Sequence, residues 1–297
     1  MSWKDPPTRR EPSARRSVGP GGLEVWELAA GLASARVIPS RGGLVTRFAV
    51  GHDEVLYLDP ETLPERSKSV RGGIGVLFPI AGRLTGDRYT VDSTTYPMRP
   101  HGLARQAPWG IREVSGARIT MELCSSEATR VNYPFEFTYR LTVDLGRAGG
   151  RSLALEQEID NTGRRPLPLH LGFQPYLAVP EERKHQARVE TAARTCYDNL
   201  RGEIVPYAPP DFGAGEVDLH LLDHRSMGTR LHVPGRPARI LQWSAQYTVL
   251  VLWTQRYKGF ICVEPWTAPA DAFNSGQGLV LLPPGERFAG HLIITVE

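Results

Sequence analysis

Hydrophobic and polar residues alternate at every second position along much of this chain. The longest alternating run is Phe135–Leu145, and shorter runs occupy Ile119–Leu123 and Leu292–Val296. This period of two predicts antiparallel strands with one buried face and one face in water. Leu23–Leu28 and Ala33–Ile38 flank a short link that contains a glycine, and together they predict a β-hairpin.

Two further features complete the prediction of an all-β protein. Thr248–Thr254 is continuously apolar, which predicts a strand buried on both faces. Helical periodicity is nearly absent, and only Glu181–Glu190, after Pro180, suggests a short helix. The 30 glycines and 25 prolines separate many short segments. We therefore expect a large antiparallel β-sandwich with few short helices, formed as a single domain by residues 21–297.

The first 20 residues differ in composition from the rest of the chain. They contain five basic and two acidic residues, so they carry the whole formal charge of +3 and leave residues 21–297 neutral. Residues 1–20 are also rich in proline and are predicted to be a disordered basic tail. A nucleic-acid partner is not expected, because the body of the protein has no excess of basic residues.

Signals for membranes and disulfides are missing from the sequence. No apolar run reaches the roughly 18 residues of a transmembrane helix, and the N-terminus has no apolar core typical of a secretory signal. The three cysteines have no paired spacing typical of a disulfide framework or a zinc site. Cys124 and Cys262 are interpreted as small buried hydrophobic residues. We expect a cytoplasmic protein without a membrane partner.

Polar residues lie within four short apolar segments that are far apart in the sequence. The segments are Arg71–Arg83, His101–Arg105, Gly172–Tyr176 and Cys262–Trp266. Polar groups in apolar strands cost free energy unless they are paired or have a function. Their carboxylate, imidazole, guanidinium and indole groups together would suit a pocket for a sugar.

Glu264 is the strongest candidate for chemistry. In an extended strand it shares a face with Phe260 and Cys262. A carboxylate on such an apolar face has either a raised pKa or a firm partner. We interpret it either as a general base or as a strand-end glutamate paired with an arginine.

His101 lies between a proline and a glycine, so the chain approaches it in an extended form and can then come close to a ligand. It is interpreted either as a pocket residue or as a core histidine bonded to a carbonyl. Arg71, Arg83 and Arg105 suit sugar hydroxyls, a phosphate or structural ion pairs. Aromatic residues that either stack on the apolar face of a sugar or fill the core are Trp109, Tyr176 and Trp266.

His220 and His224, with two aspartates nearby, resemble a metal-binding cluster in composition. On a strand, however, residues four apart stand about 13 Å from each other at ~3.3 Å per residue. We therefore expect no metal site. No zinc-protease, Walker A, nucleophile-elbow or dinucleotide-binding motif occurs either.

In their order and spacing, the polar segments resemble the aldose 1-epimerase family, the galactose mutarotase-like proteins. The resemblance covers nearly everything after residue 20 and rests on Arg71–Pro79 with Gly82-Arg83, His101–Arg105 with Trp109, Asn161, Gly172–Tyr176, Val263–Trp266, Asn274 and Pro284–Glu286. It implies a large antiparallel β-sandwich. It also implies interconversion of the α and β anomers of a hexose or related sugar, without a metal or nucleotide cofactor.

The resemblance also implies roles for individual residues. Glu264 corresponds to the base that removes the proton of the C1 hydroxyl, and His101 to a residue that holds and polarises the sugar near its ring oxygen. Asp218 is matched more loosely with a family aspartate that binds sugar hydroxyls. The implied substrate contacts are Arg71, Arg83, Arg105, Tyr176, Asp218 and Trp266.

Gln174 is where the chain departs from the family pattern. The family places its acid, a histidine, in a Gly-Phe/Trp-His-Pro-Tyr stretch, and this chain has Gln174 there. An amide donates hydrogen bonds but does not transfer a proton, and loss of a general acid typically costs about 10²–10⁴ in rate. His170 lies four residues earlier, about 13 Å away along a strand, too far to replace residue 174 directly unless a bulge shortens the distance. His101 or a water is the expected replacement.

Three functions remain open from the sequence. The first is an aldose 1-epimerase with an altered or weakened proton relay. The second is a sugar-binding protein that has kept the pocket and lost the reaction. The third is a repurposed isomerase or lyase, in which Glu264 removes a proton from a non-sugar carbonyl compound and Gln174 steadies an oxygen. In each case the expected partner is a small molecule, and the sequence does not specify the oligomeric state.

Overall fold

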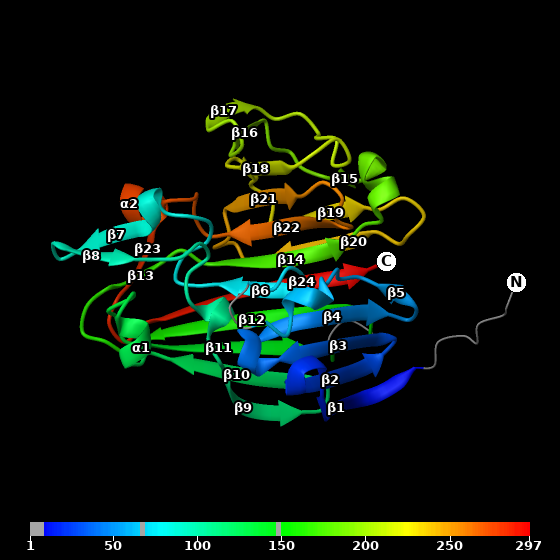
Figure 1. The fold of residues 1–297 in the computed structure, drawn as a ribbon, viewed down its shortest axis with the longest axis horizontal. Helices are drawn as coiled ribbons and strands as arrows, with labels where there is room; N and C mark the ends of the chain where they lie inside the picture. Colours follow the sequence, from blue (N-terminus) through cyan, green and yellow to red (C-terminus); the bar gives the residue numbers. More distant parts are fainter. Residues whose placement is uncertain (1–8, 66–68, 147–149) are drawn as a thin grey trace, which may run out of the picture.

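The computed structural model describes residues 9–65, 69–146 and 150–297, in which two large antiparallel sheets lie face to face (Figure 1). The first sheet has the order β1 (Arg10–Val18), β2 (Glu24–Gly31), β3 (Ala33–Ile38), β4 (Leu44–Val50), β6 (Ile74–Leu77), β14 (Gly172–Ala178), β22 (Phe260–Trp266), β21 (Val249–Thr254), β18 (Val217–Leu221), β16 (Thr195–Asp198), β17 (Glu203–Pro206), with β5 (Asp53–Glu54) beside β4.

The second sheet has the order β15 (Arg188–Val189), β19 (Gly228–His232), β20 (Arg239–Trp243), β24 (Arg287–Val296), β12 (Ser152–Asn161), β11 (Phe137–Asp144), β10 (Arg118–Cys124), β9 (Gly110–Ser115). Smaller elements are the strand pairs β13 (Leu167–Leu169) with β23 (Val280–Leu282) and β7 (Arg88–Val91) with β8 (Thr94–Pro97), and the one-turn helices α1 (Glu127–Arg130) and α2 (Ala272–Ser275). The predicted antiparallel β-sandwich is therefore confirmed.

The main hydrophobic core lies between the two sheets. From the first sheet, Val37, Phe48 and Phe173 enter this core, and from the second sheet Leu141 and Leu155 do so; all five are fully buried. These side chains come from every second position of their strands, as the sequence pattern predicts. Burial of a large aliphatic or aromatic side chain stabilises a fold by about 1.5–3 kcal/mol, so this layer supplies much of the stability of the sandwich.

The structure also bears on the expected local elements. β2 and β3 pair as the predicted hairpin, and the apolar segment before residue 255 forms the largely buried strand β21. The expected helix after Pro180 is a single 3-10 segment, Glu181–Gln186. Cys262 is buried as expected, but Cys124 is exposed because it lies on the polar face of β10.

Strand β1 lies within the segment predicted to be a disordered tail. Arg10–Val18 pairs antiparallel with β2, so this part of the expectation is wrong. The strand is held through its backbone while most of its side chains are exposed, and for that reason no hydrophobic alternation marks it in the sequence. The first part of the predicted tail, residues 1–8, lies outside the described residues.

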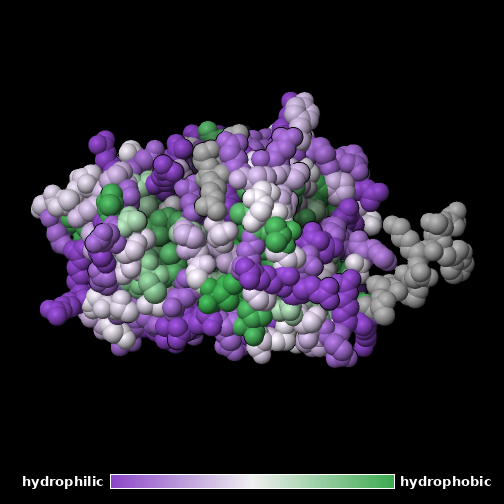
Figure 2. Space-filling model, turned by 60° about the horizontal axis from the view of Figure 1, so that its bottom comes forward, coloured by the Kyte–Doolittle hydropathy of each residue, from purple (hydrophilic) through white to green (hydrophobic). Residues whose placement is uncertain are grey.

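The face of the molecule that Figure 2 shows carries little that resembles a hydrophobic binding patch. With the edge that carries β1 and β9 turned toward the viewer, the surface is mostly hydrophilic and its hydrophobic groups are small and separate (Figure 2). Exposed hydrophobic residues of these two strands include Val18 and Ile111. Scattered hydrophobic residues of this kind are normal on a protein surface.

The central strands β14 and β22 of the first sheet carry different kinds of side chain on their two faces. Toward the second sheet, β14 and β22 present Phe173, Ile261 and Val263. On the opposite face they present polar residues, including Gln174 and Glu264. Because side chains alternate along a strand, the same short segments supply both the core and a polar face, and that face forms the floor of a cavity.

Candidate functional site

The strand register brings the polar residues of this face into one row. Gly172 pairs with Trp266 and Tyr176 with Cys262, so Gln174 lies opposite Glu264. On its other side, β22 pairs with β21, where Val251 lies opposite Glu264 and also opposite His220 of β18. Gln174, Glu264, Val251 and His220 therefore follow one another across four strands on the same face.

A cavity of about 990 Å³ opens above this row. Its size lies in the usual range for small-molecule sites. It brings together nine of the residues that sequence analysis considered for the site: Arg71, Arg83, His101, Arg105, Gln174, Tyr176, Asp218, Glu264 and Trp266. Segments nearly 200 residues apart thus converge on one chamber.

The carboxylate of Glu264 is held by two neutral donors. Gln174 Nε2 donates to Oε1 at 3.0 Å, and Trp266 Nε1 donates to Oε2 at 3.1 Å. Glu264 is only 1% exposed, and burial raises its pKa to about 8, although both hydrogen bonds and the charge of Arg105 lower it and Asp218 raises it further. A group with a pKa close to neutral can gain and release protons readily. Its hydrogen-bond partners are thus an amide and an indole rather than an arginine.

His101 lies in a tight turn that folds over the cavity. Its backbone has a φ of 64°, and the next residue, Gly102, has a φ of 73° and lies so close to Phe78 that a Cβ would come within 2.2 Å of the Phe78 carbonyl oxygen. The Gly82 N–H donates to His101 Nδ1 at 3.1 Å, so the neutral ring carries its hydrogen on Nε2. Burial holds the pKa of His101 well below its usual value. A neutral imidazole that donates through Nε2 is the result.

The three predicted arginines lie at different depths. Arg71 is exposed and donates to Gln255 Oε1 at 2.7 Å, and Arg83 is exposed and lies 3.5 Å from Asp87. Arg105 is half-buried, and burial lowers its pKa although Tyr176 and Glu264 oppose that shift. Arg105 is thus the arginine whose charge acts most directly on the row of polar residues.

The aromatic residues divide between the cavity and the core. Tyr176 packs against Phe260 and Trp253 beside the cavity, with ring centroids 4.8 and 5.8 Å away. Trp109, by contrast, does not line the cavity: it lies in the main core, and its Nε1 donates to the Ala104 carbonyl at 3.1 Å. The core-filling interpretation of Trp109 is the one the structure supports.

Sequence reasoning missed a polar chain that runs from Asn199 to His220. Asn199 Nδ2 donates to Asp218 Oδ2 at 2.7 Å, and Asp218 Oδ1 lies 3.1 Å from His220 Nε2. All three residues line the cavity. The alternation of β18 contains the signal, since Asp218 and His220 are two residues apart and so share a face.

The other histidines near the row stay outside the cavity. His170 is fully buried, its ring centroid lies 5.7 Å from that of Trp266, and burial lowers its pKa to about 3. It does not line the cavity, so it does not take the place of residue 174. His224 is buried against Thr191 and Trp243, away from His220. The described residues contain no group of three or more potential metal ligands.

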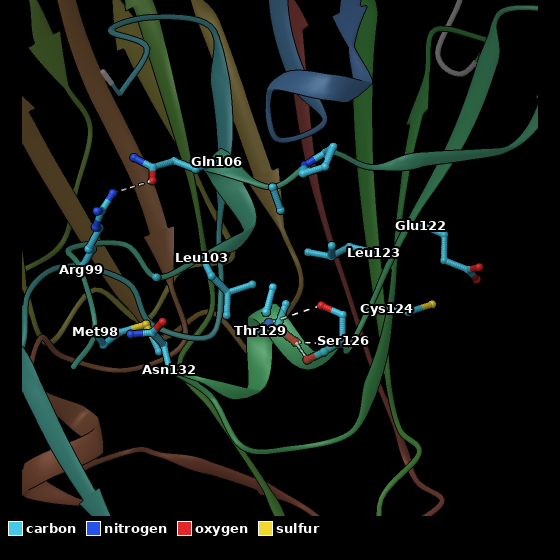
Figure 3. Close-up of a pocket in the computed structure, with 14 residues that line it drawn as sticks. Met98, Arg99, Leu103, Gln106, Glu122, Leu123, Cys124, Ser126, Thr129 and Asn132 are labelled. Carbon is cyan, nitrogen blue, oxygen red and sulfur yellow. Dashed lines mark hydrogen bonds between the residues drawn. The ribbon is translucent and has the colours of Figure 1, made fainter. Parts of the chain in front are cut away.

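A second hollow of about 680 Å³ lies between the turn over the cavity and the second sheet (Figure 3). It shares Arg99 and Gln106 with the first cavity, and Arg99 donates to Gln106 at 3.3 Å. The rest of its lining includes the exposed Cys124 and the Ser126–Thr129 capping box at the start of α1. It lacks the carboxylate–histidine row of the first cavity, which is therefore the candidate active site.

Comparisons with known proteins agree with this geometry. The family model described as aldose 1-epimerase matches residues 24–295. The Slr1438 protein of Synechocystis sp. PCC 6803 is 30% identical, with a TM-score of 0.86 and coverage of 100% of this chain and 99% of that one. The galactose mutarotase related enzyme of Lactobacillus acidophilus shares the fold at 20% identity, with a TM-score of 0.78 and coverage of 92% and 97%.

Among curated proteins, a Salmonella typhimurium protein named "Putative glucose-6-phosphate 1-epimerase" is 31% identical over 102 residues. That match covers 33% of this chain and 32% of the relative, so the two align over about a third of their lengths. No helix in the described parts of the chain is long and apolar enough to cross a membrane. The family match extends over nearly the whole sequence and coincides with the fold and the cavity, so the chain belongs to the aldose 1-epimerase family.

Proposed function

We propose that this protein is an active aldose 1-epimerase that interconverts the α and β anomers of a hexose, with Glu264 as the group that deprotonates the C1 hydroxyl. The observation that carries the proposal is the buried carboxylate of Glu264, with a pKa of about 8, on the floor of a cavity of about 990 Å³. A base with a pKa near the working pH suits proton transfer to and from a hydroxyl.

The proposed reaction begins at Glu264. Glu264 takes the proton of the C1 hydroxyl, the C1–O5 bond breaks as C1=O1 forms, and a second proton donor of the site or a water molecule gives a proton to the ring oxygen. Rotation about the C1–C2 bond exposes the other face of the aldehyde, and the reverse steps close the ring as the other anomer. Gln174 and Trp266 orient the Glu264 carboxylate through their two hydrogen bonds and thereby fix its position relative to the sugar.

His101 contributes as a hydrogen-bond donor. Its Nδ1 is occupied by the Gly82 N–H, and its pKa lies well below the usual value, so the ring is neutral and presents Nε2–H. Such a group polarises a sugar oxygen but is a poor source of a transferred proton at neutral pH. This role fits the position of His101 better than that of a replacement acid.

A phosphorylated hexose is the substrate that the charge of the cavity favours over a neutral one. Four arginines line the chamber, namely Arg71, Arg83, Arg99 and Arg105. Guanidinium groups bind phosphate in a bidentate geometry. The name of the Salmonella relative, which aligns with about a third of this chain, refers to the same class of sugar.

The proposal is tested by saturation-exchange NMR on freshly dissolved α-anomers of glucose, galactose and glucose 6-phosphate. The protein is expected to raise the rate of anomer exchange above that of buffer alone, most strongly for the phosphorylated sugar. A protein that is folded and binds these sugars without accelerating exchange would instead be a sugar-binding protein. In that case Gln174→His, which restores the family histidine, is expected to create exchange activity.

A further inference from the structure

The polar row contains a histidine, His220, that the family motifs do not point to. His220 lies on β18, two strands away from Glu264, and both side chains face the same cavity. Two strand spacings place their Cα atoms about 10 Å apart, with only Val251 between them. A sugar ring lying over Val251 would therefore have Glu264 on one side and His220 on the other.

The surroundings of His220 are built to hold an imidazole in one orientation. Its Nε2 lies 3.1 Å from Asp218 Oδ1, and the other oxygen of that carboxylate accepts from Asn199 Nδ2 at 2.7 Å. The ring also packs edge-on against Trp266, with ring centroids 5.1 Å apart. A carboxylate that orients an imidazole in this way stabilises the positive charge that the ring carries when it holds a second proton.

The other candidates near the sugar cannot supply the proton that the ring oxygen needs. Gln174 is an amide, which donates hydrogen bonds without releasing a proton. His101 Nδ1 accepts a hydrogen bond from the Gly82 N–H and so has no room for a second proton on the ring. His170 is fully buried and does not line the cavity. Besides Glu264 and Asp218, the other charged or titratable residues that line the cavity are Tyr176 and the four arginines Arg71, Arg83, Arg99 and Arg105.

We infer that His220, held by Asp218, is the second proton-transfer residue of the site and does the work that Gln174 cannot do. The inference rests on the proposed epimerase function. Glu264 takes the C1 hydroxyl proton as the C1–O5 bond breaks. In the same step the His220 imidazolium gives its Nδ1 proton to O5, and its Nε2–H keeps the hydrogen bond to Asp218. When the ring closes, O5 returns that proton to His220 and Glu264 returns its proton to O1, so the protein ends unchanged.

The decisive experiment compares His220→Gln with the matched control His232→Gln, which changes an exposed histidine of β19 far from the cavity lining. The rate of anomer exchange is expected to fall by about 10²–10⁴ in His220→Gln, while the affinity for the sugar, measured by calorimetry, changes less than about threefold. His232→Gln is expected to keep the wild-type rate. His220→Asn serves as the second variant if His220→Gln does not fold.

Chemical rescue by imidazole distinguishes proton transfer from a purely structural role of His220, because added imidazole would not restore activity lost through a structural change. In His220→Ala, added imidazole is expected to restore part of the lost rate at saturating sugar. A His220→Gln protein that exchanges anomers at the wild-type rate would overturn the inference and leave the epimerase proposal standing. So would a loss that imidazole fails to restore and that parallels a loss of sugar affinity, because His220 would then only bind the sugar. A wild-type protein without exchange activity would overturn the epimerase proposal itself.

Discussion

The two faces of β14 and β22 are buried to the same degree but do different work. Toward the second sheet, Phe173 and Val263 are fully buried among apolar neighbours. On the cavity face, Gln174 and Glu264 are 5% and 1% exposed, and each is bonded to the other. The contrast shows that burial alone does not distinguish the core from the site. The two are distinguished by whether the buried side chains are apolar or are polar and hydrogen-bonded.

The two faces also make opposite contributions to stability. Burial of an apolar side chain on the inner face stabilises the fold, whereas a buried ionisable group on the cavity face has a raised pKa and opposes folding when it is charged. The inner face thus offsets what the cavity face costs. Substitutions on one face should therefore change stability, and substitutions on the other should change activity.

The largest expected effect on the cavity side is that of Glu264→Gln. The substitution keeps the size of the side chain and its contact with Gln174 but removes the base, so anomer exchange should slow by about 10²–10⁴. Thermal unfolding should show a melting temperature equal to or above that of the wild type. Glu113→Gln, at an exposed position of β9, is the control and should keep the wild-type rate. A Glu264→Gln protein with normal exchange would assign the base to another residue.

On the inner face, Phe173→Ala should produce the converse result. Phe173 is fully buried beside Gln174 but points into the core, so its truncation should lower the free energy of unfolding by about 3–5 kcal/mol. Chemical denaturation measures this loss. The exchange rate per folded molecule should change far less than in Glu264→Gln. Equal losses of activity in the two variants would show that the faces are not separable.

The same contrast explains how much of the fold the sequence predicts. The residues of the inner face follow a local hydrophobic pattern in the sequence. For that reason β11, the hairpin of β2 and β3, and the buried strand β21 were all predictable. Strand β1 was not, because it is held through its backbone pairing with β2 and its side chains carry no apolar pattern. Pairing of that kind depends on the partner strand rather than on the segment itself.

The cavity face was predictable only where motifs marked it. The segments around Glu264, His101 and Gln174 were singled out because polar residues interrupt apolar runs, and the structure brings them to one chamber. The connection of Asn199, Asp218 and His220 was missed, since which strands are neighbours, and in which register, depends on pairings between distant segments. The roles of these residues stay predictions that the variants described here test.

A smaller effect concerns stability as a function of pH. The pKa of Glu264 is about 8 in the folded protein against an ordinary value of 4.5, so between these values the folded state binds more protons than the unfolded state. Stability should therefore fall as pH rises from about 4.5 to about 8, by at most about 1.4 kcal/mol per pH unit. Glu264→Gln lacks this contribution. Urea unfolding of both proteins at several pH values measures the difference, and parallel curves would contradict the raised pKa.

The smallest expected effect is that of Trp266→Phe, which keeps an aromatic ring but removes the donor to Glu264 Oε2. Because that hydrogen bond lowers the pKa of Glu264, its loss should raise the pKa further and move the rising limb of the pH–rate profile about one unit toward alkaline pH. Trp253→Phe is the matched control, since that indole donates to Glu216 instead, at 3.1 Å. A limb that stays in place in Trp266→Phe would mean that the ionisation of another group governs the rate, and the cavity face would then owe its reactivity to a residue other than Glu264.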